Sequence, residues 1–174
     1  MSKWLTKGLA SAGVTAVMLG LLVSPAAAHD GDSLAAVRHA TARFHDVDRA
    51  MAAGYLKAAL PCFDRPGVGG MGLHYVMGSL INGTVTATKP QALVYEVDGD
   101  KLNLVAVEYL IPVPASAAEA PRLFGQPFHP AFLPNGDPLP LWELHAWIWR
   151  HNPLGTFADY NPNVDLCPGP GESD

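Results

Sequence analysis

Three residues able to bind a metal ion, His74, Glu108 and His145, occur singly in three separate apolar segments of the chain. Two neutral imidazoles and one carboxylate are a common ligand set for zinc or non-haem iron, and ring nitrogens also suit copper. The sequence has no short pair such as H-x-H or H-E-x-x-H, so only the fold can bring such ligands together. It predicts a transition-metal or small-ligand site if the three side chains converge.

Alternation of side chains along a β-strand makes Glu108 the most informative of the three. In segment 101–111, one strand face carries an apolar row that includes an acid: Leu102, Leu104, Ala106, Glu108 and Leu110. A carboxylate in such a row must be hydrogen-bonded, paired, protonated or bound to a cation, because burying it bare is costly. We expect Glu108 to point into the domain and to have a partner there.

The same alternation gives both histidines a largely apolar strand. His74 shares its face with Gly72 and Val76, and these small neighbours leave space around the imidazole. His145 shares its face with three larger residues: Glu143, Trp147 and Trp149. Each of three predicted strands therefore contributes one metal-binding side chain.

A helix is predicted over residues 33–54, where apolar residues recur at helical spacing. Its apolar stripe is centred near Phe44 and Met51. Asp48 lies about 40° from that centre, and His45 lies at the edge of the stripe. We expect Asp48 or His45 to supply a fourth ligand or to orient an imidazole.

The remaining elements predict an α+β domain. Segments 91–97 and 101–111 are rich in β-forming residues and are separated by an Asp-Gly-Asp turn, which is typical of a hairpin. Further strands are expected at 71–77 and 141–150, and segment 112–140, with its many prolines, reads as a long irregular loop. The expected fold is one N-terminal helix packed on an antiparallel β-sheet or small open barrel.

The first 28 residues have the pattern of a secretory signal peptide. Lys3 and Lys7 precede an apolar stretch, 9–23, and three alanines, 26–28, offer the small residues that signal peptidase requires. The apolar stretch is too short for a stable membrane span, and no cysteine follows it to carry a lipid. We therefore expect a secreted or periplasmic protein with no membrane insertion after cleavage.

Cleavage divides the chain into residues 1–28, a single globular domain at 29–167 and a disordered tail at 168–174. Loss of the two leader lysines moves the formal net charge from −5 to −7. An acidic chain without basic runs argues against nucleic acid or anionic lipid as partner. The expected partner is a metal ion or a small molecule, and the oligomeric state stays open.

The chain has two cysteines, Cys62 and Cys167, and both remain after cleavage. In an oxidising compartment we expect them to form a disulfide that ties the end of the helical region to the C-terminal end. A cysteine nucleophile activated by histidine is chemically feasible, but an oxidising compartment disfavours it.

Two other interpretations of the histidines stay open. The buried Glu and His residues could hydrogen-bond to one another, or to Tyr and Arg residues, and form a purely structural polar core in a non-catalytic binding or envelope module. If cleavage exposes His29, its free amine and imidazole could instead clasp copper with one more histidine.

Four segments, GMGLHYV, LVAVEYLIP, RLFGQPF and LHAWIWRHNPLGTFADYNP, resemble those of a group of short exported bacterial proteins. The resemblance covers most of the mature chain. It implies a single exported domain built around His74, Glu108 and His145. It brings no reaction or cofactor with it, so the sequence leaves open whether the protein is an enzyme.

Overall fold

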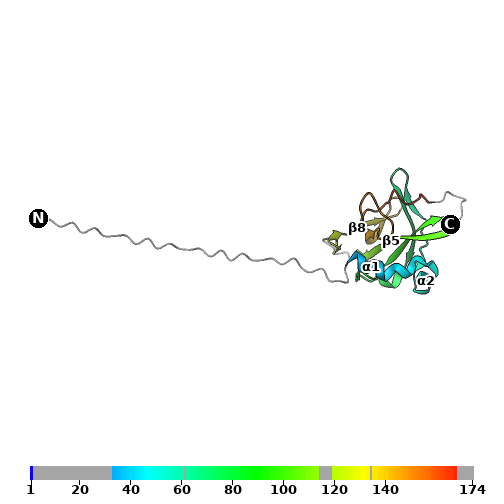
Figure 1. Ribbon diagram of the computed structural model, residues 1–174, viewed down its shortest axis with the longest axis horizontal. Coiled ribbons are helices and arrows are strands. Elements are labelled where there is room, and N and C mark those ends of the chain that lie inside the picture. Colours follow the sequence, from blue (N-terminus) through cyan, green and yellow to red (C-terminus); the bar gives the residue numbers. More distant parts are fainter. Residues whose placement is uncertain (2–32, 61, 114–118, 134, 168–174) are drawn as a thin grey trace.

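The computed structural model describes Met1 and residues 33–60, 62–113, 119–133 and 135–167. Residues 2–28 of the expected signal peptide, His29 and the tail 168–174 lie outside the described residues. Within the described part, no helix is long and apolar enough to cross a membrane. The helical segment near the start of the described chain consists of α1 (Leu34–Thr41), the 3₁₀ helix η2 (Ala42–His45) and α2 (Val47–Ala52) (Figure 1).

Seven of the described strands form one antiparallel sheet. Its strands are β1 (Leu56–Lys57), β2 (Phe63–Arg65), β3 (Gly69–Val76), β4 (Ala92–Asp98), β5 (Lys101–Pro112), β8 (His129–Phe132) and β9 (Pro138–Ala146). The order is β1-β3-β4-β5-β9-β8, with β2 also paired to β3. This open order supports an α+β arrangement with an antiparallel sheet and does not support a barrel. The short elements are η3 (Gly78–Leu80) and a separate ribbon of β6 (Arg122–Leu123) and β7 (Gln126–Pro127).

The predicted single helix over 33–54 is wrong, because the chain breaks and restarts at Asp46. Asp46 has an extended backbone, and its carboxylate accepts hydrogen bonds from the first amides of α2, so it acts as a new N-cap. The break leaves the carbonyl of Phe44 to accept a hydrogen bond from the Tyr95 hydroxyl at 2.7 Å. Met51, expected at the centre of the apolar stripe, is 42% exposed rather than buried.

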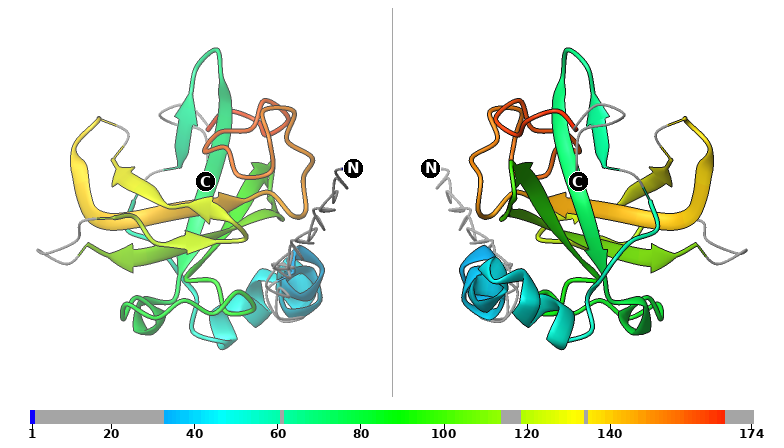
Figure 2. Two further views of the ribbon diagram at one scale, coloured as in Figure 1. Left: turned by 90° about the vertical axis from the view of Figure 1, so that its left-hand side faces the viewer. Right: turned by 90° about the vertical axis from the view of Figure 1, so that its right-hand side faces the viewer.

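One face of the sheet packs against this helical segment. Val37 and Phe44 join the main hydrophobic core with Tyr75, Tyr95 and Leu144, which come from three strands. The opposite face carries a smaller apolar group, which comprises Val94, Val105, Ala106, Trp147 and Val164. In Figure 2 the helices lie below the sheet, and the orange-to-red C-terminal segment, residues 150–167, lies on the opposite side, beside the teal strands β2 and β3.

The predicted hairpin is confirmed, with Asp98 paired to Lys101 across a two-residue turn. One detail differs, because the register shifts between Val94 and Tyr95 and leaves an extra residue on β5. Leu104 therefore belongs to the core on the helical side, whereas Ala106 belongs to the opposite group. The apolar row expected to lead from Leu102 and Leu104 to Glu108 is interrupted by this bulge.

The proline-rich segment 112–140 is more regular than expected. It contains β6, β7 and β8, and β8 pairs with β9 at the edge of the sheet. An edge position tolerates Pro130, which has no amide to donate to a further strand. Strand β8 places His129 opposite Glu143.

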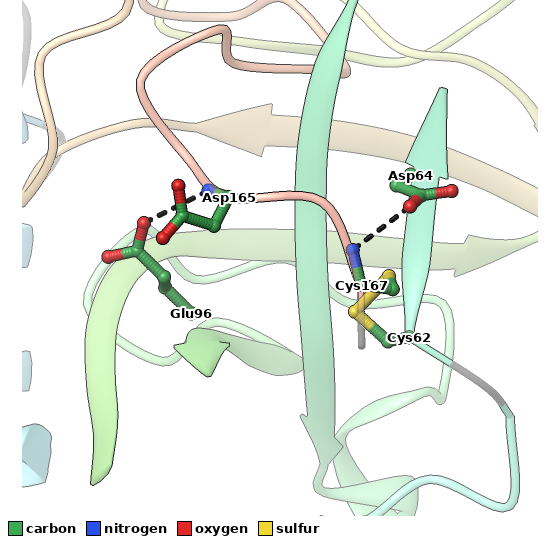
Figure 3. The surroundings of a disulfide bond; sticks show 5 residues. All are labelled: Cys62, Asp64, Glu96, Asp165 and Cys167. Atoms are coloured by element: carbon green, nitrogen blue, oxygen red, sulfur yellow. Dashed lines mark hydrogen bonds between the residues drawn. A yellow bond between two sulfur atoms is a disulfide. The ribbon is translucent and has the colours of Figure 1, made fainter. Parts of the chain in front are cut away.

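The C-terminal segment is fixed to β2, β3 and β4 (Figure 3). The predicted disulfide between Cys62 and Cys167 is confirmed, with the Cα atoms 5.6 Å apart. The amide of Cys167 donates to Asp64, and the amide of Asp165 donates to Glu96. Glu96 also pairs with Arg150.

The C-terminal segment lies directly on the backbone of β3. The amide of Gly70 donates to the carbonyl of Val164, and the amide of Asn161 donates to the carbonyl of Gly70. A Cβ atom at Gly70 would lie 2.2 Å from the carbonyl oxygen of Asp165, so a glycine is required for this approach. The segment thereby closes the sheet face opposite the helices.

Candidate metal centre

Neighbouring strands bring His74, Glu108 and His145 to one side of the sheet. Glu108 on β5 lies directly opposite His145 on β9. On the other side of β5, Glu108 is paired with Ala92 of β4, and His74 of β3 is paired with Val94 of the same strand. Because β4 contributes only small side chains here, the imidazole of His74 can reach across it towards Glu108.

The three side chains are buried and close together. Their relative exposures are 7% for His74, 3% for Glu108 and 0% for His145. The Nε2 atom of His74 lies 3.5 Å from Oε2 of Glu108, and the Nε2 atom of His145 lies 3.6 Å from Oε1. Both distances exceed those of ordinary hydrogen bonds. One possible ligand atom from each residue lies within 4.8 Å of the other two.

Several buried ring nitrogens at this site have no hydrogen-bond partner. They are both nitrogens of His145 and the Nδ1 atom of His74. Buried polar atoms in folded proteins nearly always have a hydrogen-bond partner. Unpaired nitrogens therefore indicate either a site for a ligand or a core that is destabilised by unsatisfied polar atoms. His74 and His145 face each other edge-on, with ring centroids 6.0 Å apart.

Burial keeps both imidazoles neutral at ordinary pH. It lowers the pKa of His74 to about 3, to which the nearby His145 also contributes, while the backbone of Gly72 opposes the shift. Burial also lowers the pKa of His145 to about 4. Burial, followed by the charge of Glu143, raises the pKa of Glu108 well above its ordinary value. Neutral imidazoles are the form that binds metal ions, whereas Glu108 must lose its proton to do so.

A second group of residues continues this site, and sequence reasoning assigned no role to its members. His129, Glu143 and Asp159 each offer a ligand atom within 4.8 Å of the other two. His129 Nδ1 lies 3.5 Å from Oε1 of Glu143, and its Nε2 lies 2.9 Å from Oδ1 of Asp159. Glu143 and Glu108 lie on adjacent strands and line the same small cavity, so the two groups are contiguous.

The ionisation of the second group reflects its half-buried position. Burial raises the pKa of Glu143 to about 7, although the charge of His129 opposes the shift. Contact with Asp159 raises the pKa of His129. Although burial opposes the change, His129 lowers the pKa of Asp159.

Only part of the second group had a signal in the sequence. Glu143 shares the alternating face of His145, so strand alternation alone could have added it to the site. His129 was placed in an irregular loop, because the surrounding prolines hid the edge strand β8. Asp159 comes from the C-terminal segment, and its position depends on tertiary contacts that no local pattern records.

His45 and Asp48, expected to support the site, are not part of either group. Both are exposed, and the ring of His45 packs edge-on against Trp149 at 4.4 Å. The reason is topological, because the helical segment covers the face of the sheet opposite His74 and Glu108. Trp149 lies beyond the end of β9, and its ring nitrogen donates to the Thr41 hydroxyl of α1.

Two cavities meet at Glu143. A small cavity of about 70 Å³ is mostly apolar, with lining residues that include Phe63, Met71 and Leu110, and it reaches His74 and Glu108. An open groove of about 600 Å³ has a more polar lining that includes the second group. Met71, Phe132 and Glu143 line both. A ligand in either space can therefore approach the buried carboxylates.

The arrangement offers neutral nitrogen donors and carboxylate oxygens beside a small apolar cavity. Such a donor set can hold a transition metal ion, and an adjoining cavity leaves room for water or a small ligand at that ion. No protein-family model matches this chain, and no curated protein or solved structure is significantly similar to it.

Proposed function

We propose that the protein binds a divalent transition metal ion, such as zinc, iron or copper, through His74, Glu108 and His145. The observation that carries this proposal is the burial of two imidazoles around one carboxylate at 3.5 and 3.6 Å, without hydrogen bonds between them. In a purely structural network we would expect these nitrogen and oxygen atoms to lie at hydrogen-bond distance. Atoms that bind the same ion are instead held farther apart, because the ion lies between them.

The spacing agrees with the size of a coordination sphere. Histidine nitrogens and carboxylate oxygens bind zinc at about 2.0–2.2 Å, so neighbouring ligand atoms around a tetrahedral ion lie roughly 3.3–3.5 Å apart. The two nitrogen–oxygen distances differ from that value by a few tenths of an ångström. Small side-chain adjustments would bring Glu108, His74 and His145 onto one ion.

The principal alternative is a binding or envelope module whose polar core is purely structural. This alternative must explain why His145, which is fully buried, has neither ring nitrogen paired. A buried polar group without a partner costs about 1–3 kcal/mol. Ion binding would satisfy the His145 nitrogen that faces Glu108, whereas a structural role leaves that cost in place.

Loss of the two imidazoles should remove the bound ion. We expect chelator-treated protein, produced without a histidine tag, to take up at least one equivalent of Zn²⁺. His74→Ala combined with His145→Ala should weaken this binding by about 100-fold or more, because two of three ligands are lost. Calorimetric titration with Zn²⁺ and elemental analysis measure the change.

Two further variants make this result interpretable. His39→Ala removes an exposed imidazole and should leave uptake unchanged. Glu108→Gln keeps the shape of the carboxyl group and should also weaken binding. This variant tests the site if the double variant fails to fold. Uptake below about a tenth of an equivalent of Zn²⁺, Fe²⁺ or Cu²⁺ refutes the proposal. So does a double variant that loses thermal stability but keeps wild-type uptake.

We infer that the protein works outside the cytoplasm, in the periplasm or the medium. The disulfide between Cys62 and Cys167 supports this location, since such bonds persist in oxidising compartments. The leader-like pattern at residues 1–28 supports it independently. N-terminal sequencing of protein exported from a bacterial host tests the location and the cleavage site together.

A further inference from the structure

We propose that His129, Glu143 and Asp159 bind a second divalent cation, and that Glu108 and Glu143 join the two sites into one two-ion centre. The individual cation site stands on its own residues. The two-ion centre rests on the proposed function of His74, Glu108 and His145. Mn²⁺ and Fe²⁺ suit the second site best, because two of its three ligands are carboxylates.

The geometry of the second site comes from three separate parts of the chain. Strand pairing places His129 on β8 directly opposite Glu143 on β9. The C-terminal segment adds Asp159, which contacts His129. The ligand atoms of these residues lie within 4.8 Å of one another, the same limit that the buried group satisfies. Side-chain exposures of 35%, 14% and 41%, for His129, Glu143 and Asp159, leave the site open to ions from the groove.

The contact between Glu108 and Glu143 connects the two sites. These residues lie on adjacent strands, two positions out of register, and both line the small apolar cavity. Two carboxyl groups in contact can share a proton or bind cations between them. In two-ion centres the ions lie about 3.5–4 Å apart, a distance that one carboxylate can bridge.

The surrounding charge also favours a second cation. The two groups together contain three carboxylates, Glu108, Glu143 and Asp159, alongside three imidazoles. Among the described residues that line the groove, Arg65 is the one lysine or arginine side chain, and its guanidinium lies over the ring of Tyr160 at 5.1 Å. Once cation binding has displaced their protons, the charge of −3 on these carboxylates exceeds the +2 of a single divalent ion.

Titration with Mn²⁺ alone tests the second site in the full exported chain with its disulfide intact. After chelator treatment, we expect the wild-type protein to bind two equivalents. Asp159→Asn and His129→Gln should each weaken the second equivalent by about tenfold or more and leave the first unchanged. Asp100→Asn, in the exposed hairpin turn, and His39→Gln serve as matched controls and should keep two equivalents.

Electron paramagnetic resonance provides a readout that stoichiometry does not. Two Mn²⁺ ions at a shared carboxylate should give a magnetically coupled spectrum in the wild-type protein. Asp159→Asn should give the spectrum of an isolated ion. Two equivalents without coupling would place the second ion elsewhere and overturn the two-ion centre.

The remaining outcomes separate the two proposals. The wild-type protein could bind one equivalent of Mn²⁺ that is lost in Glu108→Gln and His145→Gln but kept in Asp159→Asn. This result would refute the second site and support the site of His74, Glu108 and His145. If the one equivalent of Mn²⁺ is instead lost in Asp159→Asn and kept in His145→Gln, the second site is supported and the site of His74, Glu108 and His145 is refuted. No bound Mn²⁺ overturns the second site, and Zn²⁺ uptake then decides the buried site separately.

Discussion

Replacing both Cys62 and Cys167 by serine should lower the free energy of unfolding by about 4–5 kcal/mol. The bond closes a loop with a sequence separation of 105, so its removal releases a large amount of conformational entropy in the unfolded chain. A decrease of this size is comparable with the total stability of many domains. Urea denaturation without reductant, monitored by tryptophan fluorescence, measures it.

Reduced and alkylated wild-type protein is the control for this double variant. It should show the same loss of stability, because it lacks the same cross-link. The C-terminal segment should also detach from Gly70 and Glu96 at lower urea concentration than the rest of the sheet, since the disulfide anchors its end. A change in unfolding free energy below about 1 kcal/mol would contradict the entropic account.

The sequence predicted the parts of the fold that depend on local signals. The Asp-Gly-Asp turn and the β-forming residues on both sides of it define the hairpin of β4 and β5. Alternation within β3 and β9 separated His74 from Leu73 and Tyr75, and His145 from Leu144 and Ala146, which belong to the core beside the helices. It was wrong for Trp149, which lies beyond the end of β9 and packs against the helical segment. The convergence of His74, Glu108 and His145 remained a hypothesis at that level, because the sequence does not give the strand order on which it depends.

Features that depend on competition between local and tertiary contacts could not be predicted in the same way. Asp46 can sit within a helix or cap a new one, and a uniform helical period does not separate these states. The hydrogen bond from Tyr95 to Phe44 stabilises the break, and it joins residues 51 positions apart. The bulge in β5 likewise depends on pairing with β4 and not on the sequence of β5 alone.

The expected role of His45 and Asp48 was wrong because the helix could pack on either of the two faces of the sheet. An amphipathic pattern shows that one side of a helix is buried, but not which face of the sheet covers it. The helices cover the face that carries Tyr75 and Tyr95. The other face is closed by the C-terminal segment, whose irregular sequence gave no indication that it would add Asp159 to the site.

The stability of the metal-free protein should depend on pH in both directions. On the acid side, His74 and His145 have pKa values of about 3 and 4, below the ordinary value of 6.5. The histidines therefore bind protons in the unfolded chain but not in the folded protein, and the free energy of unfolding decreases as the pH falls below 6.5. The lowered pKa of Asp159 adds a loss in the same direction below about pH 4.

On the alkaline side, the raised pKa values of Glu108, Glu143 and His129 act in the opposite direction. Glu143 has a pKa of about 7 when folded and about 4.5 when unfolded, so the folded protein holds the extra proton. This stabilisation is complete below pH 4.5 and is lost as the pH rises through 7. The loss from Glu143 alone is about 3 kcal/mol. Between about pH 4.5 and 6.5 the histidine and glutamate effects largely cancel.

Metal-free protein should therefore be most stable between about pH 4.5 and 6.5 and should lose stability as the pH rises from 6.5 to 8.5, because Glu108, Glu143 and His129 all have raised pKa values. Urea denaturation with a chelator across this pH range measures the profile. Glu143→Gln should remove the part of this fall that ends near pH 7, whereas Asp100→Asn should leave the profile unchanged. Stability that keeps rising to pH 8.5 would contradict the assigned pKa directions.

Addition of Zn²⁺ should change this profile unequally. At pH 5 the ion must displace a proton from Glu108 before it binds, whereas at pH 8 less work is needed because part of the folded population has already lost acidic protons. Zn²⁺ should therefore raise the unfolding free energy more at pH 8 than at pH 5. A purely structural core would show the alkaline fall with and without Zn²⁺, because nothing would replace the protons that buried carboxyl groups lose.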